Sequence, residues 1–148
     1  MTAILIDTNI LVYSFDLAEP QKKAIARDLL AQLQLYQQGH LSIQCVAEFF
    51  NVVSRGILPK MTAEDASVQV EFFLHSFPIY PLTSVIVREA VRGVREHQLS
   101  YFDAQLWACA KLNQVPCIFS EDFQDGQTLE GIRFVNPFAQ TFQLEKWL

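Results

Sequence analysis

The chain has 148 residues, a formal charge of −5 and 51% hydrophobic residues, so it is long enough to bury the core of one domain without a disulfide or zinc staple. Its 12 phenylalanines and its low content of charged residues, 18%, exclude disorder over most of the length. The acidic balance argues against a protein that holds nucleic acid by net charge alone, but it allows a nuclease whose acids gather at a metal site. No apolar stretch approaches the roughly 18 residues that span a bilayer, and no basic region precedes the first apolar run. We therefore expect a cytoplasmic protein with no membrane segment.

The predicted elements alternate between short apolar strands and longer amphipathic helices. In chain order, the strands are expected at 3–6, 41–43, 117–119 and 132–135, with an extended segment at 79–82. The helices, caps included, are expected at 10–15, 20–38, 44–55, 62–75, 83–97 and 100–113. This alternation predicts a single α/β domain over residues 1–148, with a mainly parallel sheet between two layers of helices.

The cysteines and glycines exclude several common kinds of site. Cys45, Cys109 and Cys117 lie in apolar runs and are odd in number, so we expect reduced thiols in the core. No CxxC pair is present and the three histidines are far apart, so a zinc site is not expected. The five glycines form neither a dinucleotide-binding motif nor a phosphate-binding loop.

Polar residues follow two of the predicted strands directly. Residues 7–9 (Asp-Thr-Asn) come after the first strand, residues 120–122 (Ser-Glu-Asp) come after the strand at 117–119, and Asp125 stands one short loop further on. In a parallel sheet the ligand site lies beyond the carboxyl ends of the strands. These residues are therefore the first candidates for a functional site.

Each candidate acid also has an ordinary structural explanation. Asp7 could cap the helix that follows it, and Asp122 could sit in a turn. Glu48 could belong to a solvated helix face with an ion pair. Asp103 could complete a capping box with Ser100, although it stands on an otherwise apolar helical stripe, where a carboxylate is costly unless something compensates its charge.

Taken together, the four acids indicate a metal site. If Asp7, Glu48, Asp103 and Asp122 converge at roughly 6 Å, each pair costs about 3 kcal/mol at an effective dielectric constant near 20. Six such pairs would cost on the order of 17 kcal/mol, which exceeds the stability of a typical domain. A divalent cation relieves this repulsion, and a site rich in oxygen ligands selects Mg²⁺ or Mn²⁺.

The order of these motifs is similar to that of a known family. The stretch 5–13 (LIDTNILVY) resembles the opening of a PIN domain, 44–49 (QCVAEF) resembles its second acidic element and 99–104 (LSYFDA) its third. The segments 120–126 (SEDFQDG) and 135–138 (VNPF) resemble its closing part. The resemblance covers nearly the whole chain, and the length is similar to that of the VapC-like toxins of prokaryotic toxin–antitoxin pairs.

The resemblance implies a parallel sheet of about five strands and a metal-dependent ribonuclease, with a protruding helical pair for which 20–38 and 44–55 are the candidates. The acidic set that it implies for catalysis and for Mg²⁺ or Mn²⁺ is Asp7, Glu48, Asp103 and Asp122. The residues that it implies in supporting roles are Thr8 and Asn9, which would order the first loop, Ser120, which would orient metal or water, and Asp125, an additional acid.

The expected reaction is hydrolysis of an RNA phosphodiester by a water that the cation activates, and the resemblance favours products with a 5′-phosphate and a 3′-hydroxyl. Expected partners are the RNA substrate, an antitoxin that covers the acidic cleft and a second copy of the chain in a homodimer. Arg55, one turn from Asn51 on the helix of Glu48, is the preferred contact to an RNA phosphate. The basic residues of 20–38 and 83–97 either line grooves that follow the RNA backbone or lie on ordinary solvated helix faces.

Three other interpretations were considered. An Asp-dependent phosphatase usually carries Asp-x-Asp after its first strand, but residue 9 is Asn9. A phospho-accepting signalling domain needs a lysine that 120–122 does not supply. A PIN-like module that binds RNA or protein without cutting it remains the main alternative. The aromatic segment 138–148 is expected to pack on the core or, failing that, to form a partner surface.

Overall fold

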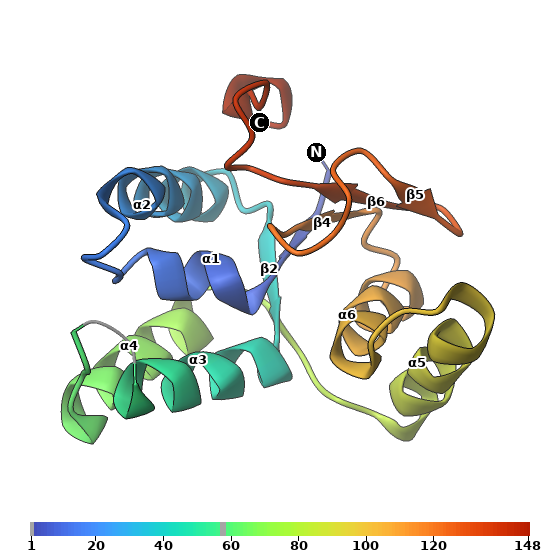
Figure 1. Cartoon of the computed structure of the whole chain (residues 1–148), viewed down its shortest axis with the longest axis horizontal. Helices are drawn as coiled ribbons and strands as arrows, with labels where there is room; N and C mark the ends of the chain where they lie inside the picture. The colour runs from blue at the N-terminus through green and yellow to red at the C-terminus, as the bar shows by residue number, and fades with distance from the viewer. Residues whose placement is uncertain (1, 57–58) are drawn as a thin grey trace.

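The computed structural model describes residues 2–56 and 59–148 and shows helices on both faces of a six-stranded sheet (Figure 1). In chain order the strands are β1 (Ile4–Ile6), β2 (Gly39–Ser42), β3 (Ile79–Tyr80), β4 (Cys117–Phe119), β5 (Thr128–Leu129) and β6 (Ile132–Val135). The helices are α1 (Thr8–Tyr13), α2 (Pro20–Leu35), α3 (Ile43–Arg55), α4 (Ala63–Ser76), α5 (Ser84–His97) and α6 (Tyr101–Leu112), with a final 3-10 turn η1 (Leu144–Lys146). None of the helices in the described part of the chain has the length and apolar character needed to cross a membrane.

The sheet order is β3-β2-β1-β4-β6-β5, and every pairing is parallel except that of β5 with β6. Successive residues of β1 point to opposite faces, so Ile4 and Ile6 enter one hydrophobic cluster with α1 to α4, while Leu5 enters the other with α5 and α6. The predicted three-layer α/β fold with a mainly parallel sheet is thus confirmed.

The sixth strand is the main departure from the expected count of about five. β5 is only two residues long and joins β6 through a tight turn in which Glu130 and Gly131 both have positive φ, at 48° and 85°. Such turns are typical of two-residue hairpins. A strand of two residues is too short for an alternating pattern to reveal in the sequence.

Several element ends differ from prediction for local reasons. The first helix begins at Thr8 rather than at residue 10, because the Asp7 side chain accepts a hydrogen bond from its first amide. α2 ends at Leu35 rather than at residue 38, because the chain turns left-handed at Gln37, where φ is 57°. The chain leaves the helix early enough for β2 to start at Gly39 instead of residue 41.

The helices at 20–38 and 44–55, the candidates for a protruding or dimer-forming region, do not pack on each other as a protruding pair. α2 buries Ala26, Leu29 and Leu33 in the core beside the sheet, whereas the main helical partner of α3 is α4. At the other end of the chain the aromatic tail packs on the same core, with Phe138, Phe142, Leu144, Trp147 and Leu148 all partly buried against it. The expectation that this tail packs back on the core is confirmed.

The position of α6 depends on its close packing against α5. Gly93 of α5 faces the fully buried Trp107 of α6, and a Cβ atom added at Gly93 would lie 2.8 Å from Trp107 Cζ3. Lys111 of α6 reinforces this pairing through an ion pair to Glu89 of α5 at 2.7 Å. Arg92 contacts the same glutamate from within α5, and both cations also contact Glu130.

We predict that Gly93→Ala lowers the free energy of unfolding by about 1–3 kcal/mol, because the added methyl group overpacks the contact with Trp107. The overpacking outweighs the gain in helix propensity, which is about 1 kcal/mol. Urea denaturation followed by circular dichroism measures the change. Val91→Ala, at a 44% exposed position on the same helix, is the control and is expected to stay within about 1 kcal/mol of the wild type. Equal stability of Gly93→Ala and the wild type would contradict the prediction.

Candidate active site

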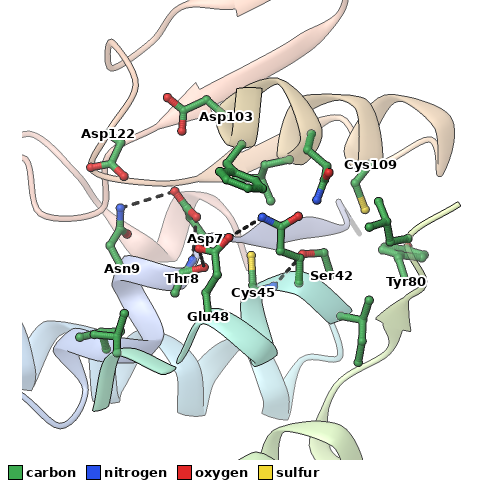
Figure 2. A pocket seen from close by; sticks show the side chains of 18 of the residues that line it. Asp7, Thr8, Asn9, Ser42, Cys45, Glu48, Tyr80, Asp103, Cys109 and Asp122 are labelled. Carbon is green, nitrogen blue, oxygen red and sulfur yellow. Dashed lines mark hydrogen bonds between the residues drawn. The ribbon is translucent and has the colours of Figure 1, made fainter. Parts of the chain in front are cut away.

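The four acids singled out from the sequence line one pocket of about 390 Å³. Each comes from a different part of the fold: Asp7 follows β1, Glu48 lies in α3, Asp103 lies in the first turn of α6 and Asp122 follows β4. In Figure 2 these four residues surround one end of the pocket, and Tyr80 marks the other.

Asp7 occupies its position because β1 and β4 pair in parallel. Ile6 is in register with Phe119, and the Asp7 amide donates to the Phe119 carbonyl at 3.0 Å, so Asp7 lies beside Ser120. The Asp7 carboxylate accepts from the Thr8 amide at 2.7 Å and from the Ser120 hydroxyl at 2.6 Å. It therefore caps α1 and lines the pocket at the same time.

Burial raises the pKa of the Asp7 carboxyl to about 6. The hydrogen bonds from Ser120 and Thr8 oppose this rise, whereas the negative charges of Asp122 and Asp103 add to it. Ionisation of Asp7 therefore carries a cost for the folded chain, and Asp122 and Asp103 are near enough to contribute to it.

Ser120 connects two of the acids. Its hydroxyl is buried, donates to Asp7 Oδ2 and accepts from the Asp122 amide at 3.0 Å. Asn9 adds weaker contacts from Nδ2 to Ser120 Oγ and Asp7 Oδ2, at 3.4 and 3.5 Å. The other amide oxygen, Asn9 Oδ1, is buried with no hydrogen-bond partner in the described part of the chain. The Asn9 side chain therefore presents an acceptor that protein groups leave unused.

Glu48 is held by two polar neighbours rather than by a cation. Thr8 Oγ1 donates to Glu48 Oε2 at 3.2 Å, and Gln44 Nε2 donates to Glu48 Oε1. The alternative of an ordinary ion pair on a solvated face does not describe Glu48, because among the described residues it forms no salt bridge.

The capping alternative for Asp103 is also not realised. Ser100 occupies the N-cap of α6, but its side chain makes no capping hydrogen bond. Within residues 2–56 and 59–148, the side chains of Asp103 and Asp122 form no hydrogen bond to another protein group. Both carboxylates are therefore available to a ligand from the pocket.

Two other predicted residues lie away from this group. Asp125 accepts a hydrogen bond from the Asn136 amide at 2.8 Å and does not line the pocket. Arg55 is exposed in the last turn of α3, seven residues from Glu48 and hence about 10 Å further along the helix axis, outside the pocket lining. Asp125 stabilises a loop, and Arg55 flanks the pocket at a distance.

Two of the basic residues in the helices at 20–38 and 83–97, Lys22 and Arg92, pair with acids. Lys22 pairs with Glu121, which also accepts from the Tyr13 hydroxyl at 2.6 Å, so Glu121 is not simply solvent-facing. Arg92 pairs with three glutamates, Glu89, Glu96 and Glu130. For Lys22 and Arg92 the interpretation as ordinary solvated residues therefore needs modification, because both belong to structural ion pairs.

The charge of the pocket is uniformly negative. Its lining includes a fifth acid, Asp16, and no lysine, arginine or histidine among the residues that the structure describes. Elsewhere, Glu96, His97 and Glu130 place three potential metal ligands within 4.8 Å of one another, but Arg92 contacts both glutamates of that group and Lys111 contacts Glu130. Those cations already compensate its charge, whereas the pocket has no such compensation.

The sequence-based prediction did not include several residues that line the pocket: Asp16, Tyr80, Phe102 and Gln105. The last two stand three residues apart in α6 on the helix of Asp103. That spacing places them on one face of the helix, and it is the sequence feature from which their place in the pocket could have been predicted. Asp16, in the connection between α1 and α2, and Tyr80, the last residue of β3, reach the pocket only through the tertiary structure.

Comparisons with known proteins agree with this geometry. The family model described as PIN domain matches residues 4–124. A toxin–antitoxin complex from Klebsiella pneumoniae superposes with a TM-score of 0.68 at 20% identity, covering 92% of this chain and 98% of that one. The toxin VapC20 from Mycobacterium tuberculosis, described as cleaving the sarcin–ricin loop, gives 0.64 at 16% identity, with 81% and 92% covered.

VapBC2 from Rickettsia felis, solved with a DNA fragment from its promoter, gives a TM-score of 0.65 at 14% identity and covers 90% of this chain and 97% of that one. None of the curated proteins matches the chain by sequence. At these identities the solved structures establish a shared fold, and the family follows from the model match, which spans most of the chain and all four acids of the pocket. The chain belongs to the PIN domain family.

Proposed function

We propose that the protein is a divalent-metal-dependent ribonuclease and the toxin of a toxin–antitoxin pair. The observation that carries this proposal is a pocket lined by five carboxylates and, among the described residues, by no basic side chain. An RNA phosphate would be repelled by such a pocket unless a cation reversed the local charge. The family match and the toxin–antitoxin neighbours support the same interpretation.

The donor set fits Mg²⁺ or Mn²⁺. All of the acids offer hard oxygen ligands, as these ions prefer. In the described part of the chain, no three of the carboxylates lie close enough together to have oxygens all within 4.8 Å. Such an open arrangement suits an ion that keeps several waters and binds one or two carboxylates directly. The unpartnered Asn9 Oδ1 supplies one further acceptor for such water.

We assign the acids to complementary roles. Asp7, Asp103 and Asp122 would hold the cation, one or two of them directly and the rest through its waters. Glu48, fixed by Thr8 and Gln44, would accept a proton from water on the α3 side of the pocket. When bound, the cation would activate water and neutralise the developing charge on the phosphate. These roles are those expected of a phosphodiester hydrolase that needs no histidine.

Ser120 and Asn9 would act as positioning residues. Ser120 links the Asp7 carboxylate to the Asp122 backbone, so its hydroxyl fixes the distance between these two acids. Asn9 contacts both Ser120 and Asp7. Arg55 would contact an RNA phosphate beyond the pocket, and Asp125 would hold the loop after β4. A homodimer and a cytoplasmic location complete the proposal.

The decisive test is RNA cleavage with Mg²⁺ or Mn²⁺. We expect cleavage by the wild type and a loss of about 100-fold or more in Asp7→Asn and Asp103→Asn, because each removes charge that the cation requires. Asp28→Asn, which changes an exposed acid of α2 outside the pocket, is the matched control and should cleave normally. Cleavage that survives in both pocket variants, or with EDTA, would exclude this mechanism. RNA binding without cleavage would favour the non-catalytic alternative.

A second prediction concerns stability and pH. Because the pKa of Asp7 is raised from 3.8 to about 6, its contribution to folding is greatest below pH 4 and is lost as the pH rises through 6. Without metal at pH 7.5, Asp7→Asn should therefore raise the free energy of unfolding by about 2–3 kcal/mol, and the gain should vanish at pH 4.

Guanidinium denaturation at the two pH values, with EDTA and then with Mg²⁺, measures this effect. Mg²⁺ should stabilise the wild type more than Asp7→Asn, because binding to the folded state adds to its stability. A variant that is less stable than the wild type at pH 7.5 in EDTA would show that burial of Asp7 is not costly.

A further inference from the structure

The pocket has a second half that the four acids do not use. Phe102, Gln105, Leu106 and Cys109 of α6 line it at helical spacing, immediately beside Asp103. The segment from β3 into α5 provides more of the lining through Tyr80, Pro81, Leu82 and Ile86. Figure 2 shows Tyr80 and Cys109 at the end of the pocket away from Asp122. This half is mainly apolar, and it is continuous with the acidic half.

Phe102 is an unusual residue for this position. It is 65% exposed although it adjoins Asp103 and lines the pocket. Its ring contacts Tyr101 edge-on, with centroids 5.2 Å apart and an interplanar angle of 76°. An exposed aromatic side chain contributes little to the core, so the stability of α6 does not explain it.

Gln105, one turn further along α6, adds a hydrogen-bond donor. The residue is only 5% exposed, and its Oε1 accepts from the Tyr101 hydroxyl at 2.7 Å. Its Nε2 donates to no protein group in the described part of the chain. This nitrogen is not among the fully buried, unpartnered polar atoms of the described residues, so it is open to the pocket and can donate to a ligand there.

We propose that the apolar half of the pocket holds one unstacked nucleobase of single-stranded RNA, with Phe102 stacking on the base and Gln105 Nε2 donating to an acceptor on its edge. The choice of RNA as the ligand rests on the proposed function. A nucleotide carries base and phosphate on one sugar, so a phosphate at the acidic half brings its base to the neighbouring wall. Aromatic stacking with hydrogen bonds to base edges is the usual way to bind unpaired RNA.

An apolar protein segment fits the same half less well. It would cover Phe102 and Leu82, and its backbone carbonyls would accept from the Gln105 amide, but it would bring no phosphate to the adjoining acidic half. A base satisfies both features, because every base has a flat face and at least one acceptor atom on its edge.

Binding measurements test the stacking role. The probe is a short fluorescein-labelled single-stranded RNA of mixed sequence, compared with an abasic strand of the same length, in Ca²⁺ to slow hydrolysis. We expect the wild type to bind the base-bearing strand about ten-fold more tightly and Phe102→Ala to lose this preference. Phe102→Trp should keep it, and so should the control Phe72→Ala, which removes a 48% exposed phenylalanine from α4. Equal binding of the two strands by the wild type, or an unchanged preference in Phe102→Ala, would overturn the proposal.

A second pair of variants tests Gln105. Gln105→Leu should even out the relative affinities for oligoadenylate, oligocytidylate and oligouridylate, because the donor that distinguishes base edges is gone. Tyr101→Phe removes the hydroxyl bound to Gln105 and keeps the donor, so it should preserve the wild-type ranking. The assignment of Gln105 is wrong if Gln105→Leu keeps the ranking, or if Tyr101→Phe loses it to the same extent.

These outcomes separate this proposal from the proposed function. If the wild type cleaves RNA but Phe102→Ala retains its base preference and its KM, the base site is wrong and the nuclease stands. If the base preference depends on Phe102 while no metal supports cleavage, the base site stands and the nuclease is wrong. If Phe102→Ala binds both RNA strands as the wild type does but loses affinity for a protein, the surface belongs to a protein partner and the base site is excluded.

Discussion

The parallel pairing of β1 with β4 is the constraint on which the site depends. It sets Ile6 beside Phe119, and the residues that follow each strand then emerge at the same edge of the sheet. Asp7 and Ser120 are therefore adjacent although 113 residues separate them in sequence, and the Ser120 hydroxyl carries the connection on to Asp122. Neighbouring β2 leads directly into α3, which brings Glu48 to the same edge.

This arrangement has an electrostatic cost that the fold does not remove. Beside α5 and α6, by contrast, acids are matched by bases in the network of Arg92 and Lys111 with Glu89 and Glu130. That network lowers the pKa of Glu89 to about 2, whereas the pKa of Asp7 is raised to about 6. The surroundings of Glu89 therefore favour its ionised form, whereas those of Asp7 disfavour it. The pocket gathers five carboxylates with no basic side chain among its described lining residues, as expected where a cation is to be bound rather than a structure stabilised.

The sequence was informative wherever a local rule applied. Continuous apolar runs identified β1 and β4, and the acid directly after β1 predicted a ligand site at the carboxyl ends of the strands. The sequence did not predict β5, because two residues are too few to show an alternating pattern. It did not predict the packing of α3 on α4, because the apolar face of an amphipathic helix does not specify which helix will cover it. Asp125 was placed with the acids because it lies near Asp122 in sequence, but its carboxylate turns to the Asn136 amide. The apolar half of the pocket depends on tertiary contacts, and only the spacing of Phe102 and Gln105 could have indicated it.

The packing of α5 on α6 connects the two halves of the pocket. α6 carries Asp103 toward the acidic end and Phe102 and Gln105 toward the apolar end, so a small shift of this helix moves all three together. Gly93 allows the close approach that holds Trp107 in place, and Lys111 ties the far end of α6 to α5 through Glu89. Rigid support of this kind matters because catalytic groups must be held to within about 0.5 Å of a productive geometry. A contact on the side of α6 away from the acids therefore controls where Asp103, Phe102 and Gln105 stand relative to Asp7 and Asp122 on the sheet edge.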